Sequence, residues 1–208
     1  MSRPQLLVLA LASAILAVLA VLFVDAPLAL WVARYEQAGF WQPIVRVLEV
    51  VVGVEPFDLA VPIVLALGAI VTVASRRWYA QSRRWMFLAL AYLVARNVMM
   101  WAKLFSGRLR PHQWIKIGGA MFGHVGWGVS FPSGHVTLFG GLLIPLAVAV
   151  PRLRPALVIV PFIMLARIAV QAHFLSDVLG GLALVSLVAW MFVPVLSIPL
   201  SPLVRQPA

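Results

Sequence analysis

The chain has 208 residues, of which 63% are hydrophobic and only 11% are charged. Its apolar residues form runs of about twenty, which indicates membrane spans rather than the apolar stripes of soluble helices. The net charge is +10 and cysteine is absent, which excludes disulfides, thiolate metal ligands and a cysteine nucleophile. The basic residues lie at the ends of the apolar runs, where lipid headgroups attract them, and this placement argues against nucleic-acid binding.

The first apolar run covers residues 6–24. It is longer than a secretory signal core of roughly 7 to 15 residues, and further spans follow it, so we expect a retained helix. Five later runs are long enough to cross about 30 Å of hydrocarbon. The sequence therefore predicts an all-α polytopic membrane protein with six transmembrane helices, folded as a single domain over residues 1–208. The five later spans are expected at 57–74, 86–102, 136–150, 156–172 and 177–198.

Two segments between the spans are long. Residues 25–54 mix aromatic and charged side chains, a composition typical of helices in the headgroup layer, so interfacial helices are expected between the first and second spans. Residues 103–135 are polar and rich in glycine. This loop is the expected place for a binding site and a mobile flap.

The basic residues also predict the orientation of the chain. If the N-terminus is cytoplasmic, the opposite side carries six basic residues, and four of these lie in the loop 103–135, where a substrate could account for them. Both termini are therefore expected in the cytoplasm, with the loop 103–135 on the outer face. The cytoplasmic side then carries no acidic residue in its loops. Its basic residues are Arg3, Arg76, Arg77, Arg83, Arg84, Arg152, Arg154 and Arg205.

Three polar clusters stand at the outer ends of the predicted spans. The first reads K-L-F-S-G-R-L-R-P, from Lys103 to Pro111, and alone it is also explained as a juxtamembrane basic anchor. The second is Phe131-Pro132-Ser133-Gly134-His135. Ser133 suits a helix N-cap, and the free N–H groups of a first helical turn bind anions. A capped helix with an interfacial histidine would explain Ser133, but it would not explain why Gly134 and His135 follow.

The third cluster comprises Arg167, His173 and Asp177. An arginine inside a span is costly and indicates either a function or a structural partner. Six residues of helix place Arg167 about 9 Å below His173, a suitable depth for reaching a bound anion. Asp177 could accept the imidazole N–H of His173 and fix its tautomer. The alternative is a paired structural arginine near an interfacial histidine.

The six-span topology brings all three clusters to one face, because spans three and five end there and spans four and six begin there. Two histidines, an acid and several cations in one pocket suit phosphoryl transfer without a required metal. Five polar residues stay outside this scheme. Asp58, Arg96 and Asn97 are expected to make contacts between helices, and His112 and His124 to line the loop.

The clusters resemble the signature of the type 2 phosphatidic acid phosphatase superfamily, K-x6-R-P, P-S-G-H and S-R-x5-H-x3-D. The resemblance covers residues 103–177 at the family's spacing, and six helices with an outward-facing site are similar to its membrane members. One position departs, since Ala166 stands where the family usually has serine. The matching residues are Lys103, Arg110 and Pro111; Pro132, Ser133, Gly134 and His135; and Arg167, His173 and Asp177.

This resemblance and the chemistry of the side chains imply the same roles. His173 would attack phosphorus, with Asp177 holding its ring so that the attacking nitrogen carries a lone pair. His135 would donate a proton to the leaving oxygen, and would then accept one from the water that hydrolyses the phosphohistidine. The phosphoryl oxygens would be held by Lys103, Arg110, Ser133, Gly134 and Arg167.

The expected function is hydrolysis of a lipid phosphomonoester or pyrophosphate at the periplasmic face of a bacterial inner membrane, without a cofactor or metal. Undecaprenyl pyrophosphate, phosphatidylglycerol phosphate and phosphatidic acid fit equally well. Alternatives within the family are a lipid A phosphatase, a lipid-dependent phosphotransferase, and a haloperoxidase that uses the pocket for vanadate, although members of this last group are soluble. A lipid-binding or transport protein that keeps the pocket without turnover is the alternative from a different class.

Overall fold

The computed structural model describes residues 1–35, 42–44, 46–47, 60–75 and 77–197. Helices dominate these residues, which confirms the all-α prediction, and extended pairing within them is limited to isolated bridges of Arg108 with Phe122 and Val129. The described residues include the α-helices α1 (Arg3–Phe23), α2 (Asp25–Tyr35), α4 (Ala60–Ala74), α5 (Ser82–Ser106), α6 (Pro111–Ile117), α7 (Gly134–Ala149), α8 (Ile159–Ala169) and α9 (Leu175–Phe192). They also include the 3-10 helices η1 (Tyr79–Gln81), η2 (Pro151–Val158) and η3 (Val193–Ser197).

Three helical segments among the described residues are long and apolar enough to cross a membrane, namely Arg3–Phe23, Tyr79–Ser106 and Leu175–Ser197. They cover the first, third and sixth predicted spans. The second and fourth spans correspond to α4 and α7, which have 15 and 16 residues, about 23 and 24 Å of helix. Positions 57–59 and 198 of the predicted spans lie outside the described residues.

The fifth predicted span, 156–172, is divided in the structure. Its first residues belong to the 3-10 helix η2, which contains Pro151 and Pro155, and regular α-helix begins only at Ile159. Proline lacks the N–H that an α-helical hydrogen bond needs, so two prolines four residues apart favour the tighter turn. Helix α8 then ends at Ala169, three residues before the predicted end.

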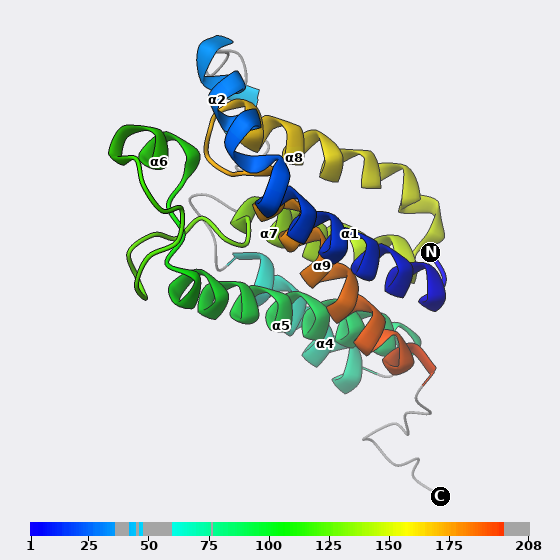
Figure 1. The fold of residues 1–208 in the computed structure, drawn as a ribbon. Coiled ribbons are helices and arrows are strands. Elements are labelled where there is room, and N and C mark those ends of the chain that lie inside the picture. Colours follow the sequence, from blue (N-terminus) through cyan, green and yellow to red (C-terminus); the bar gives the residue numbers. More distant parts are fainter. Residues whose placement is uncertain (36–41, 45, 48–59, 76, 198–208) are drawn as a thin grey trace, which may run out of the picture.

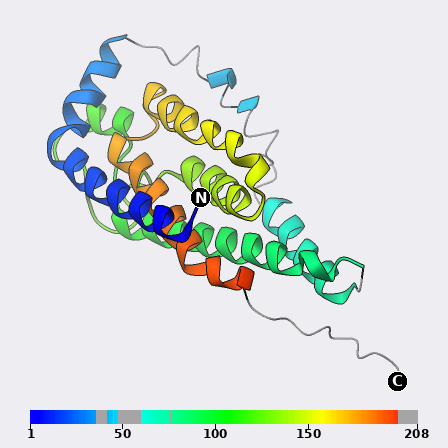
Figure 2. The ribbon, with the colours of Figure 1, turned by 90° about the vertical axis from the view of Figure 1, so that its right-hand side faces the viewer.

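The long helices pack around α9. Helix α1 lies along α9, α7 and α5 pack against it from other sides, and α4 covers α5 (Figures 1 and 2). One buried cluster joins four of these helices through Leu6 of α1, Phe87 and Ala91 of α5, Ile144 of α7 and Val185 of α9. Because lipid tails are as apolar as these side chains, close packing contributes more to such contacts than transfer from water does.

Glycines allow α7 and α9 to approach closely. A Cβ atom at Gly140 would lie 3.0 Å from Val185 Cγ2, and one at Gly181 would lie 3.2 Å from both Ser133 O and Thr137 Oγ1. Small residues at such positions are typical of helix contacts in membranes. The close approach lets the Ser133 amide donate to the Asp177 carbonyl at 2.9 Å. The starts of α7 and α9 are thereby joined.

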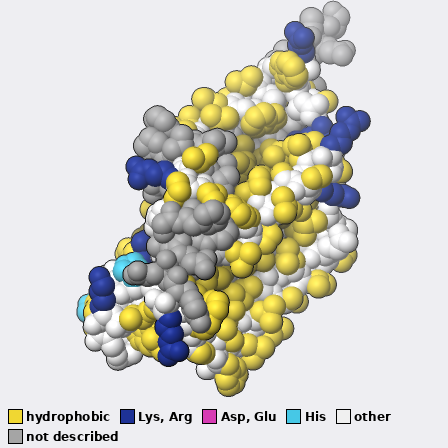
Figure 3. All heavy atoms as spheres, turned by 90° about the horizontal axis from the view of Figure 1, so that it is seen from above, with side chains coloured by type: hydrophobic (Ala, Val, Ile, Leu, Met, Phe, Trp, Pro, Cys, Tyr) yellow, Lys and Arg dark blue, Asp and Glu magenta, His cyan; other side chains and the backbone are white. Residues whose placement is uncertain are grey.

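The surface of the bundle is largely apolar. Ile15, Ile70 and Leu165 are 61%, 64% and 61% exposed, and hydrophobic side chains cover much of the face shown in Figure 3, with Lys and Arg near its margins. Soluble monomers rarely expose apolar patches of this extent. Together with the three long apolar helices, this surface indicates a membrane protein.

Asn97 does not make the interhelical contact predicted for it. Its side chain is exposed and donates to the Leu93 carbonyl of its own helix at 2.7 Å. Arg96 Nη1 lies 3.4 Å from Met100 Sδ, also within α5. The Asn97 bond satisfies its amide one turn away along the same helix, and the contact between helices expected of Arg96 stays a prediction. Asp58 lies outside the described residues.

The two ends of the bundle differ. The N-terminus and η3 lie at one end, whereas α2, α6 and the starts of α7 and α9 lie at the other (Figure 1). Helix α5 also ends at this second end. The three polar clusters therefore meet at the same end, as the six-span topology predicts.

Candidate functional site

The segment after α5 turns sharply at Gly107, which adopts φ 53°. A Cβ atom there would lie 2.3 Å from the His124 carbonyl oxygen, so glycine alone fits both the conformation and the space. The turn carries the chain from the bundle surface into its interior. Arg108, the next residue, is completely buried.

The glycine-rich loop returns over this turn and is tied to it by backbone hydrogen bonds. Gly123 N donates to Gly107 O at 3.2 Å, Leu109 N donates to Met121 O at 3.0 Å, and the Ser130 amide donates to the Arg108 carbonyl at 2.9 Å. The loop also contains the short helix α6, which was not predicted from the sequence. The mobility expected for a flap stays a prediction.

Lys103 and the start of α7 lie side by side. Lys103 Nζ donates to the Val129 carbonyl at 3.1 Å, and a Cβ atom at Gly134 would lie only 3.3 Å from Nζ. Glycine at position 134 therefore leaves room for the lysine. The first-turn amides of a helix have no acceptor within the helix, so an anion could bind here between them and the ammonium group.

Ser133 occupies the N-cap position of α7, as predicted, but its hydroxyl does not cap the helix. Its carbonyl oxygen accepts from Thr137 N at 3.0 Å and from Thr137 Oγ1 at 2.9 Å. The Ser133 hydroxyl is buried and has no hydrogen-bond partner among the described residues. Leaving such a group unsatisfied costs about 1–3 kcal/mol, which a bound oxyanion would offset.

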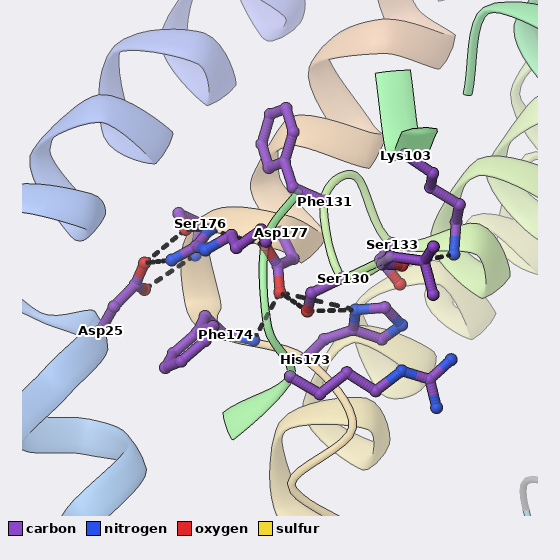
Figure 4. A network of polar contacts seen from close by, with 12 residues as sticks. Asp25, Lys103, Ser130, Phe131, Ser133, His173, Phe174, Ser176 and Asp177 are labelled. Atoms are coloured by element: carbon purple, nitrogen blue, oxygen red, sulfur yellow. Dashed lines mark hydrogen bonds and ion pairs between the residues drawn. The ribbon is translucent and has the colours of Figure 1, made fainter. Parts of the chain in front are cut away.

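His173 lies in the connection between α8 and α9, where Gln171 adopts φ 51°. The His173 ring is 2% exposed, and its Nδ1 lies 3.5 Å from both Asp177 Oδ2 and Ser130 Oγ (Figure 4). The Asp177 carboxylate is fixed in turn, because Oδ2 accepts from Phe174 N at 2.8 Å and from Ser130 Oγ at 2.6 Å. The Asp177 carboxylate thus lies beside Nδ1 of the His173 ring, and the ring nitrogen on the opposite edge is Nε2.

Burial lowers the pKa of His173 to about 4, because the interior disfavours its charged form. Asp177 opposes this shift, whereas the positive charges of Arg167 and Lys103 add to it. The ring is therefore neutral near pH 7. With Nδ1 directed at a carboxylate, the neutral tautomer carries its proton on Nδ1 and its lone pair on Nε2.

The remaining predicted site residues lie at the same end. Arg110 and Arg167 are each close enough to Lys103 to act on its charge. His135 stands in the first turn of α7, two residues after Ser133, and is partly exposed. Ala166, at the position where a serine was expected, is fully buried within α8 and leaves no polar group to satisfy.

Two residues with central positions were missed from the sequence. Arg108 was counted only as a loop charge, yet its guanidinium is bonded to Asp177 and to Asp25. Asp25 stands directly after the first apolar run. An acidic residue at the end of a span was the sequence feature that could have identified it as a candidate. Ser130 and Ser176 complete the same buried network.

His112 does more than line the loop. Its Nδ1 lies 3.0 Å from the Gln171 carbonyl oxygen, so it contacts the connection that carries His173. His124 is exposed and stacks on Trp127, with ring centroids 6.2 Å apart. Within the described residues, no group of three or more His, Asp or Glu side chains is placed to hold a metal ion.

Comparisons with known proteins agree with the position of these motifs. A family model described as PAP2 superfamily matches residues 84–198. A lipid A 1-phosphatase of Rhizobium etli is 38% identical over 82 residues, which cover 37% of this chain and 35% of that protein. A lipid A 1-phosphatase of Rhizobium johnstonii is also 38% identical over 82 residues, covering 37% and 33%. The chain thus spans about a third of the length of these curated relatives. No solved structure gives a significant match.

Proposed function

The chain belongs to the PAP2 superfamily, and we propose that it is a membrane phosphatase that removes a phosphoryl group from a lipid phosphate or pyrophosphate through a phosphohistidine at His173. The placement of the His173 ring carries this proposal, since Nδ1 is directed at Asp177 while the charges of Lys103 and Arg167 act on the same ring. A neutral imidazole beside fixed positive charges is suited to attack a phosphoryl group that those charges hold.

In the first step, His173 Nε2 attacks phosphorus and forms a P–N bond while the bond from phosphorus to the lipid oxygen breaks. His135 donates a proton to that leaving oxygen. The phosphorylated ring gains positive charge, which the Asp177 carboxylate at 3.5 Å stabilises. The lipid product leaves as an alcohol, or as a lipid monophosphate when the substrate is a pyrophosphate.

In the second step, water attacks the phosphohistidine and the P–N bond breaks. His135, now neutral, accepts a proton from this water, so it returns to its protonated form as inorganic phosphate is released. His173 becomes neutral again. No net charge or proton is left on the protein after one turnover.

The phosphoryl oxygens are held by Lys103, Arg110 and Arg167, together with the Ser133 hydroxyl and the Gly134 amide. The cations place positive charge where the transition state spreads its negative charge. The buried Ser133 hydroxyl, which has no partner among the described residues, is the donor most in need of such a ligand.

The substrate is a lipid whose phosphate stands at the membrane surface. The aligned relatives are named lipid A 1-phosphatases, so a lipid A 1-phosphate joins undecaprenyl pyrophosphate, phosphatidylglycerol phosphate and phosphatidic acid as a candidate. Transfer of the phosphoryl group to an acceptor other than water would make the protein a lipid-dependent phosphotransferase. Measuring inorganic phosphate against total lipid product separates these two outcomes.

Phosphate release by the detergent-purified protein tests this function. At least one of the four candidate lipids is expected to be hydrolysed. The activity should survive EDTA and be blocked by vanadate, because cationic side chains can neutralise the phosphate without a metal. A His173→Ala preparation serves as the blank. Loss of turnover in EDTA that magnesium restores would contradict the mechanism, and binding of lipid without any turnover would favour the lipid-binding alternative.

We also place six spans across a bacterial inner membrane, with both termini cytoplasmic and the site on the outer face, since the arginine-rich loops favour the cytoplasm. The absence of natural cysteine allows a clean test. Ala120→Cys and Ala80→Cys place single thiols at exposed alanines near opposite ends of the bundle. In intact cells, a membrane-impermeant maleimide is expected to label position 120 and not position 80. Labelling of position 80 alone would reverse the orientation.

A further inference from the structure

Arg108 is fully buried and bonds to Asp25, Ser176 and Asp177, which Figure 4 labels. Its Nη1 donates to Asp177 Oδ1 at 2.6 Å and to Ser176 Oγ at 2.5 Å, and its Nη2 donates to Asp25 Oδ2 at 2.5 Å. The guanidinium thus bridges two carboxylates that stand 152 positions apart in the chain. Planar guanidinium groups suit such bridging because their N–H groups point in fixed directions.

The Arg108 guanidinium also contacts two aromatic rings. Its Cζ lies 4.8 Å from the centroid of Phe122, in the glycine-rich loop, and 4.5 Å from that of Phe174, directly before α9. A cation over the face of an aromatic ring is attracted by the ring, and more strongly where water is excluded. The position of Arg108 is therefore determined by packing as well as by hydrogen bonds.

Asp25 holds the start of α9 from the far side of Arg108. Its Oδ1 accepts from Ser176 N at 3.0 Å, and its Oδ2 accepts from the Ser176 hydroxyl. Ser176 directly precedes Asp177, whose carboxylate faces His173. By bonding to Ser176, the Asp25 carboxylate at the start of α2 therefore restrains the residue next to Asp177. Asp25 lies outside residues 84–198, where the family model matches.

The charge balance of this network bears on the ring of His173. Asp177 presents Oδ1 to Arg108 and Oδ2 to the side on which His173 Nδ1 lies. Because Arg108 shares its single positive charge between two carboxylates, Asp177 keeps part of its negative charge. This remaining negative charge on Asp177 can stabilise the positive charge that His173 gains when it is phosphorylated. Without the charge of Asp25, Arg108 would neutralise Asp177 more completely.

We infer that Arg108 and Asp25 are positioning residues for the proposed phosphoryl transfer: Arg108 fixes the Asp177 carboxylate against His173, and Asp25 limits how far Arg108 neutralises it. This inference rests on the proposed function, since it concerns the same nucleophile. Neither residue touches the substrate. Their effect is on the rate of phosphohistidine formation, not on the binding of the lipid phosphate.

Asp25→Asn and Arg108→Lys test the inference in the full-length protein. Asparagine keeps the shape of Asp25 without its charge, and lysine keeps the buried positive charge but cannot donate to both carboxylates in the same geometry. In rapid-quench experiments with a lipid phosphate, each variant is expected to form phosphohistidine about 10- to 100-fold more slowly than the natural protein, with KM and vanadate inhibition close to natural values. Arg96→Gln, near the middle of α5 and outside this network, serves as the control and should keep the natural rate.

The outcomes separate the inference from the proposed function. If the natural protein forms no phosphohistidine, the proposed function fails and the inference fails with it. A different result overturns the inference alone: the natural protein forms phosphohistidine, and the folded fraction of both variants reacts at the natural rate while only melting temperature or yield falls. The network would then contribute to stability and not to the reaction. If one variant does not fold, the rate measured with the other tests the inference, because each substitution removes a different part of the bridge.

Discussion

Replacing His173 with alanine is expected to abolish hydrolysis of lipid phosphates and aryl phosphates alike, with a loss of at least about 10⁴-fold in kcat. In the proposed mechanism this residue forms the covalent bond to phosphorus, and the Asp177 carboxylate lies 3.5 Å from its ring. A better leaving group cannot rescue a reaction that lacks its nucleophile. Initial rates of phosphate release with both kinds of substrate measure the effect.

His124→Ala is the matched control for this substitution. His124 is exposed in the glycine-rich loop and stacks on Trp127, so its removal should leave turnover near the natural rate. Melting temperatures of both variants exclude unfolding as the cause of a loss. Substantial turnover of an aryl phosphate by folded His173→Ala would show that another group attacks phosphorus.

Replacing His135 with alanine is expected to have a selective effect. A general acid contributes about 10²- to 10⁴-fold when the leaving oxygen needs a proton, as an alkoxide does. An aryl phosphate releases a stable phenolate and needs little such help. His135→Ala should therefore lose much more of its phosphorylation rate on a lipid monophosphate than on p-nitrophenyl phosphate.

Pre-steady-state kinetics test this division of labour, because the burst of phenolate reports the first step alone. In His135→Ala the burst on the aryl substrate should persist, and the second step should be slowed because the water has lost its base. Equal losses in the first step on both substrates would contradict the assignment of His135 as the general acid.

Much of the candidate site could be predicted because its residues stand at fixed spacings near helix ends. Asp177 follows His173 by four positions across a tight turn, and the structure places its carboxylate beside the ring. Ser133 precedes an apolar run and occupies the N-cap of α7. The convergence of the three clusters follows from topology alone, since alternate spans reverse direction.

The Arg108 network could not be predicted in the same way. Its bonds join Arg108 to residues 83 positions before it and 69 positions after it, at Asp25 and Asp177, and no local periodicity encodes such a pairing. Arg108 also stands among other basic residues, where a charge at a span end is ordinary. Burial, which distinguishes it from Arg110, depends on the turn at Gly107 and on the loop that covers it.

The helix boundaries were predicted less well than the helices themselves. Hydrophobicity marks residues 156–172 as one span, but Pro151 and Pro155 lie in a 3-10 helix that delays α8 to Ile159. Hydropathy is insensitive to this, because proline changes backbone hydrogen bonding more than it changes apolar character. Short helices such as α6 lie within polar loops and carry no apolar run to predict them.

The most direct test of phosphoryl transfer to His173 is to trap the intermediate. The natural protein and His135→Ala are mixed with a lipid phosphate, quenched in alkali to preserve phosphohistidine, and digested for mass spectrometry. Phosphate is predicted on His173 in both, with more in His135→Ala because hydrolysis of the intermediate has lost its base. Phosphate on His135 of the natural protein, or turnover with no phosphorylated residue in either protein, would contradict the mechanism.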